Sequence, residues 1–67
     1  MQLTINGTAR TFDPAVRTVA ELVRALALES KRIAVEKNGG IVPKSRYAET
    51  PVAAGDTLEI VGAVGGG

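Results

Sequence analysis

The sequence predicts a single small α+β domain, in which a mixed sheet of four to five strands carries one main helix on one face. Apolar and polar residues alternate in several short segments, which is typical of half-buried strands. An Asn-Gly pair separates the first two segments, and one segment in between has helical spacing behind a capping signature. With 67 residues there is one domain and no room for an enclosed substrate cavity with its catalytic shell.

The first predicted unit is a hairpin over residues 1–12. Three apolar residues alternate with polar ones over residues 1–6, which indicates a strand. Asn6-Gly7 then favours a two-residue turn, because both residue types tolerate positive φ. Residues 8–12 form the returning strand, which Asp13-Pro14 ends.

A helix is predicted to begin after Thr18. Thr18 followed by Glu21 three residues later is the signature of a capping box. The helix then presents one apolar stripe with spacing i, i+3, i+4 and i+7, formed by Val19, Leu22, Val23 and Leu26. We expect the helix to end near Leu28 or Glu29.

The middle of the chain predicts a second, shorter hairpin. Residues 32–37 alternate again with Ile33 and Val35 inward, and a turn follows at residues 38–40. A short strand continues until Pro43 ends it, because proline cannot donate to a ladder. Residues 44–50 are polar and irregular, and we expect a helical turn around Tyr47, which covers the small core.

The last predicted strand covers residues 57–64. Its alternation places Leu58 and Ile60 inward and Val61 on the other face. The order of elements allows the first and last strands to lie side by side, in parallel, at the centre of the sheet. One helix covers only one face, so the opposite face is left to solvent or to a partner.

Composition excludes several classes of function. The chain has no Cys and no His, which excludes disulfides, zinc fingers and catalysis by a thiolate or an imidazole. We therefore expect no catalytic residue, no metal site and no bound cofactor. Eight basic and seven acidic residues are interspersed and leave a net charge of +1, so we expect no nucleic-acid partner. The apolar runs are too short to cross a bilayer and no signal-like segment precedes the first strand, so we expect no membrane partner and a cytoplasmic location.

Three groups of residues carry a family resemblance. They are Asn38-Gly39 followed by Ile41-Val42-Pro43-Lys44 and Tyr47, then residues 55–60 with sequence GDTLEI, and the terminal Gly66-Gly67. On these motifs the chain resembles the ubiquitin-like (β-grasp) family, and within it the ThiS sulfur carriers of thiamin thiazole biosynthesis. The GDTLEI strand and the glycines also fit the related MoaD carriers, so the 38–47 stretch is what favours ThiS.

The resemblance implies a β-grasp domain over residues 1–64 and a flexible glycine tail over residues 65–67. In this family a ThiF-like enzyme uses ATP and Mg to adenylate the C-terminal carboxylate, here that of Gly67. Sulfur from a persulfide-bearing sulfurtransferase then replaces AMP, and the thiocarboxylate donates sulfur to a ThiG-like thiazole synthase. Gly65, Gly66 and Gly67 would enter the partner's active site, because glycine lacks a Cβ and passes a narrow channel.

Two questions stay open at this point. Val61 and Val64 are candidate docking residues, but they also fit an ordinary half-buried strand. The tail equally fits a sulfur carrier for molybdopterin or another pathway, or a ubiquitin-like modifier joined to lysines. In each of these cases the chain is a protein cosubstrate rather than an enzyme. A structural interaction domain without tail chemistry is the remaining alternative.

Overall fold

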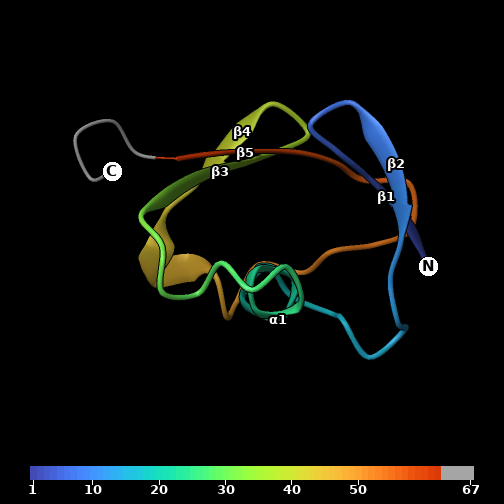
Figure 1. Cartoon of the computed structure of the whole chain (residues 1–67), viewed down its shortest axis with the longest axis horizontal. Helices are drawn as coiled ribbons and strands as arrows, with labels where there is room; N and C mark the ends of the chain where they lie inside the picture. Colours follow the sequence, from blue (N-terminus) through green and yellow to red (C-terminus); the bar gives the residue numbers. More distant parts are fainter. Residues whose placement is uncertain (63–67) are drawn as a thin grey trace.

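The computed structural model describes residues 1–62 and places them in one five-stranded sheet with one α-helix (Figure 1). The elements in chain order are β1 (Gln2–Ile5), β2 (Thr8–Thr11), α1 (Val19–Ala25), β3 (Ile33–Lys37), β4 (Gly40–Val42), the 3-10 turn η1 (Lys44–Arg46) and β5 (Thr57–Gly62). The strand order is β2-β1-β5-β3-β4, in which β1 and β5 are parallel and the other pairs antiparallel. The predicted parallel pairing of the first and last strands is confirmed, with β5 at the centre of the sheet.

The core lies between the sheet and α1, which crosses one face of the sheet (Figure 1). Its most deeply buried side chains are aliphatic and come from both layers: Leu3, Val19, Leu22, Val35 and Leu58. Burial alternates along β5, with Leu58 and Ile60 buried and Val61 exposed, which confirms the predicted register. Tyr47 follows η1 and is only 9% exposed, so its predicted role as a cover of the core is also confirmed.

The helix begins where the capping box predicted. The Thr18 hydroxyl accepts a hydrogen bond from the Glu21 amide, and the Glu21 carboxylate accepts from the amides of Arg17 and Thr18. The bond from the Arg17 amide is the main reason why the pKa of Glu21 lies below its ordinary value. This contribution to stability is complete above the ordinary pKa of a glutamate and is lost as pH falls through the lowered value.

The predicted helix end is wrong, because α1 ends at Ala25 rather than near Leu28 or Glu29. Ala27 has a φ of +60°, and its amide donates to the Arg24 carbonyl while the Leu28 amide donates to the Val23 carbonyl. These two bonds form a Schellman motif, which reverses the chain after Leu26. The early end lets Leu28 pack against the core and turns the chain back toward β3.

We expect Ala27→Gly to raise the free energy of unfolding by about 1 kcal/mol, because a Cβ is strained at positive φ. Ala25→Gly is the matched control, since Ala25 is also exposed but helical, and its free energy of unfolding should fall by about 0.5–1 kcal/mol. Urea denaturation of both variants provides the comparison. Destabilisation by Ala27→Gly equal to that of Ala25→Gly would contradict the assigned helix end.

Candidate functional site

The candidate site consists of the end of β5 and the sheet face that α1 leaves uncovered, which we call the outer face. β5 is paired on both sides, with β1 at Ile5↔Leu58 and with β3 as far as Ile33↔Gly62. The ladder therefore fixes the point from which residues 63–67 follow. Val64 and the three tail glycines lie outside the described residues, as does the predicted boundary between residues 64 and 65.

Asn6 joins the first hairpin to the end of β5. Its side-chain amide donates to the Ile60 carbonyl at 2.9 Å and its side-chain oxygen accepts from the Ile60 amide at 2.7 Å. The backbone amide of Asn6 also donates to the Leu58 carbonyl at 2.9 Å. The side chain thus takes the place of one more residue of β1, since the backbone turns away at Asn6 with a φ of +51°. Sequence reasoning found the turn but missed this bridge.

We expect Asn6→Asp to lower the free energy of unfolding by about 1–2 kcal/mol near neutral pH. A carboxylate keeps the acceptor but cannot donate, so it would face the Ile60 carbonyl without a hydrogen. Asn6→Gly keeps the positive φ without strain and removes only the bridge, and it should cost about 1 kcal/mol. Chemical denaturation measures both changes, and hydrogen exchange of the Ile60 amide reports the local loss. Wild-type stability of Asn6→Gly would show that the bridge contributes nothing.

A second network joins two of the motifs that carry the family resemblance. The Asn38 side chain donates to the Asp56 carboxylate at 3.2 Å and accepts from the Thr57 amide at 2.9 Å. The other Asp56 oxygen accepts from the Ala53 amide at 2.8 Å, and Lys37 lies 4.0 Å from the same carboxylate. The Asn-Gly and Gly-Asp motifs therefore fix the turn that starts β5, which is a structural role.

The outer face exposes two large apolar side chains among the described residues. Val61 on β5 is 56% exposed and Ile41 on β4 is 71% exposed. They lie on one face, because Val61 is opposite Ala34 and Ile41 is opposite Glu36 on the strand β3 between them. The structure thus places Val61 on an accessible surface, while its predicted docking role stays a prediction.

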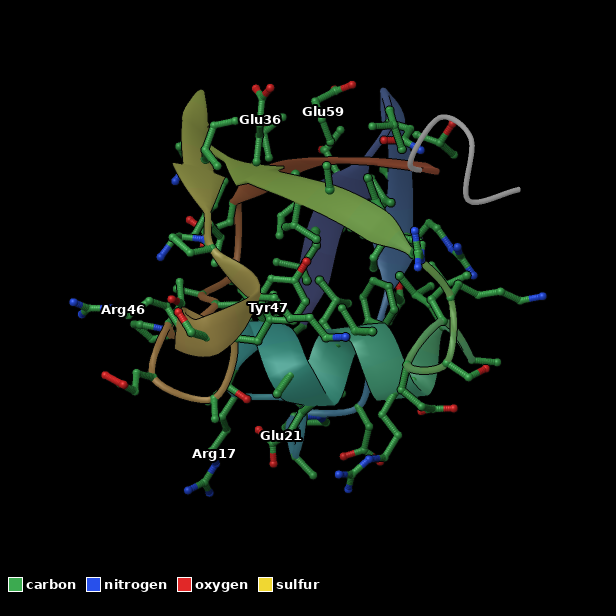
Figure 2. All side chains as sticks on the ribbon, turned by 90° about the vertical axis from the view of Figure 1, so that its left-hand side faces the viewer. Arg17, Glu21, Glu36, Arg46, Tyr47 and Glu59 are labelled. Carbon is green, nitrogen blue, oxygen red and sulfur yellow. The ribbon has the colours of Figure 1, made fainter. Side chains whose placement is uncertain are left out.

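Two carboxylates oppose each other in the middle of this face. Glu36 on β3 is paired directly with Glu59 on β5, and both side chains extend away from the helix (Figure 2). Like charges directly opposite on neighbouring strands destabilise the sheet. A cationic group that docks here would relieve the repulsion, so the outer face is suited to a partner with basic residues beside an apolar contact. Sequence reasoning missed this pair, because only the register brings the two glutamates together.

The described residues offer little chemistry of their own. Among residues 1–62 there is no group of three or more acidic, His or Cys side chains that could hold a metal ion. Tyr47 lies on the helix side of the sheet, and its burial raises the pKa of its hydroxyl above the ordinary value. Within the same part of the chain, no helix is long and apolar enough to cross a membrane. What the described residues supply is an accessible apolar and acidic sheet face beside the paired end of β5.

Comparison with known proteins gives consistent matches. A model of the ThiS family matches residues 3–67. The sulfur carrier protein ThiS of Bacillus subtilis is 37% identical over 65 residues, which cover 97% of this chain and 98% of that protein. A thiazole synthase of Paramagnetospirillum magneticum is 49% identical over all 67 residues, but this chain spans only 20% of its length.

Solved structures agree with these matches. The crystal structure of a thiamine biosynthesis protein (ThiS) from Geobacter metallireducens has a TM-score of 0.84 and 36% identity, with all of both chains covered. The solution structure of a thiamine biosynthesis protein from the same organism has a TM-score of 0.80 and covers this whole chain and 88% of that one. The expected β-grasp fold is confirmed, and with a family match over residues 3–67 the chain belongs to the ThiS family.

Proposed function

We propose that this chain is a sulfur carrier of thiamin biosynthesis, and that Gly67 is the residue that carries the sulfur. The observation that carries the proposal is the family match, which extends through the glycines to residue 67. The name of the Bacillus subtilis relative, which is matched over nearly its whole length, supports the same role. The chain acts as a protein cosubstrate, and the partner enzymes supply the catalytic groups.

The chemistry proceeds in two steps on the Gly67 carboxylate. A ThiF-like enzyme joins the carboxylate to the α-phosphate of ATP, with Mg, and releases pyrophosphate; this gives the carbonyl carbon a good leaving group. A persulfide-bearing sulfurtransferase then supplies the sulfur that displaces AMP, and reduction of the resulting acyl disulfide by a thiol leaves the thiocarboxylate. The sulfur nucleophile comes from a partner, because this chain has no Cys. ATP and Mg are used by the activating partner, and the proposed place of action is the cytoplasm, where ATP is available.

The thiocarboxylate is then consumed by a ThiG-like thiazole synthase. The Paramagnetospirillum magneticum relative supports this partner, since a protein named thiazole synthase includes a segment 49% identical to the whole of this chain. We place the docking of both partners on the outer face, around Val61 and Ile41. Glu36 and Glu59, which lie in one row with Ile41, favour a partner surface with a basic residue among apolar ones.

Mass spectrometry of the intact protein tests the proposal. The chain is incubated with its adenylating enzyme, ATP, Mg and the sulfurtransferase already loaded with its persulfide, and a thiol reductant is then added. We expect a gain of about 16 Da, since one sulfur atom replaces one oxygen atom, and digestion should place the gain on the C-terminal peptide. The reaction without ATP is the control and should leave the mass unchanged. An unchanged mass with enzymes that convert another carrier would refute the proposal, and covalent conjugates to lysines of other proteins would indicate a modifier instead.

A further inference from the structure

A groove opens on the side of α1 and η1, away from the outer face. It has a volume of about 540 Å³ and lies between the helix, the segment 28–33, and η1 with the residues that follow it. Figure 2 looks onto this side, with Tyr47 labelled between η1 and α1. Volumes of this size are typical of sites for small molecules, which measure roughly 300–1,000 Å³.

The groove is lined by apolar side chains. Val23 and Tyr47 belong to the buried core, and Leu28 and Ile33 are partly buried against it. Small residues of α1 and of the segment after η1, Ala20 and Ala48, complete the apolar lining. An apolar molecule placed here would remove the exposed parts of Leu28 and Ile33 from water, which favours binding.

Cationic side chains also line this groove. Four basic residues from different segments line the groove together with a single acidic residue, Glu29; the basic residues are Arg24, Lys31, Arg32 and Lys44. The ion pairs found among residues 1–62 join Lys37 to Asp56 and Arg46 to Glu49, so none of the four basic residues is paired within this part of the chain. The whole chain has a net charge of only +1, so positive charge is concentrated at this one groove.

We propose that the groove binds a small organic anion, in which one phosphate or carboxylate group is attached to an aromatic or aliphatic body. The body lies on Leu28, Ile33 and Tyr47, and the anionic group lies among the basic residues at the rim. An inorganic anion gains nothing from the apolar lining. A protein segment is a poorer fit, because stable protein interfaces bury on the order of 1,000 Å² or more. The proposal does not rest on the sulfur-carrier function, since it is argued from the lining of the groove alone.

Titration of the ¹⁵N-labelled full-length chain with 1-naphthyl phosphate, followed by NMR, tests the site. We expect saturable amide shifts in α1, in residues 28–33 and in residues 44–48, with β2 and β4 unchanged. A parallel titration with 1-naphthoate shows whether the groove prefers a carboxylate or a phosphate group. Binding of either naphthyl anion in the groove supports the proposal. 1-Naphthol and inorganic phosphate each lack one half of the chemistry and should bind at least about tenfold more weakly.

Variants separate a built site from non-specific adsorption. Arg24→Gln combined with Lys44→Gln should weaken the binding of 1-naphthyl phosphate by about fivefold or more. Arg10→Gln combined with Arg17→Gln removes the same charge outside the groove and should change the affinity little. All four positions are exposed, so both double variants should remain folded, as their NMR spectra will show. The proposal would be overturned if 1-naphthol bound as tightly as 1-naphthyl phosphate, or if neither naphthyl anion showed saturable binding. It would also be overturned by amide shifts confined to the outer face, or by equal losses of affinity in the two double variants.

Discussion

Ile60→Asp is expected to unfold the protein, whereas Val61→Asp is expected to leave it folded. The two residues are neighbours on β5, but Ile60 is 7% exposed in the core and Val61 is 56% exposed on the outer face. A carboxylate at the buried position has no partner and costs several kcal/mol, which is comparable to the whole stability of so small a domain. At the exposed position it stays hydrated and costs little. Circular dichroism and thermal melting of the two variants measure the difference.

Partner binding by Val61→Asp is the second half of this prediction. We expect much weaker capture by the adenylating enzyme and by the thiazole synthase, because docking would bury a carboxylate beside Glu36 and Glu59. Val61→Thr is the matched control, since it keeps the shape without the charge and should lose far less binding. A folded Ile60→Asp beside an unfolded Val61→Asp would show that the register is wrong. Undiminished capture of Val61→Asp would show that the partners do not use this face.

Deletion of Gly67, or Gly66→Val, is expected to abolish adenylation without lowering stability. The proposed partner channel admits backbone without Cβ, and a deletion moves the carboxylate away from ATP by one residue, about 3.3 Å. The core described for residues 1–62 is formed by side chains of the sheet, the helix and their connections, so we expect neither change to disturb it. ATP–pyrophosphate exchange with the adenylating enzyme measures activation, and a thermal melt measures stability.

Gly62→Ala is the control that shows whether replacing any glycine near the C-terminus, rather than a tail glycine, affects adenylation or stability. A Cβ at Gly62 meets no atom of residues 1–62 within 4 Å, and the residue precedes the proposed tail, so both stability and exchange should stay near those of the wild type. Full exchange with Gly66→Val would refute the narrow channel. A large fall in melting temperature of that variant would instead show that the tail takes part in the fold.

Local signals explain why much of the fold could be predicted. The Thr18–Glu21 capping box and the two Asn-Gly turns act within a few residues, so their sequence alone specifies their geometry. The alternation in β5 likewise decides which residues are buried, because successive side chains point to opposite faces. The resemblance added the choice of family, which the alternation by itself does not contain.

The helix end shows where local reasoning fails. Continued helix would have been compatible with the residues after Ala25, and no glycine marks the reversal at Ala27. The chain accepts a strained φ there because the reversal lets Leu28 pack against the core and directs the following residues to β3. Packing of distant segments outweighs the local preference.

The sequence by itself determined the strands, the start of the helix, the inward and outward faces and, through its motifs, the ThiS family. Only the tertiary structure decided that Asn6 reaches Ile60, 54 residues away, and that Glu36 lies opposite Glu59. Only the tertiary structure brought the basic residues of α1, of segment 28–33 and of η1 around one groove. The physical reason is that periodicity and capping depend on neighbours along the chain, whereas strand register and the enclosure of a groove depend on which remote segments pack together.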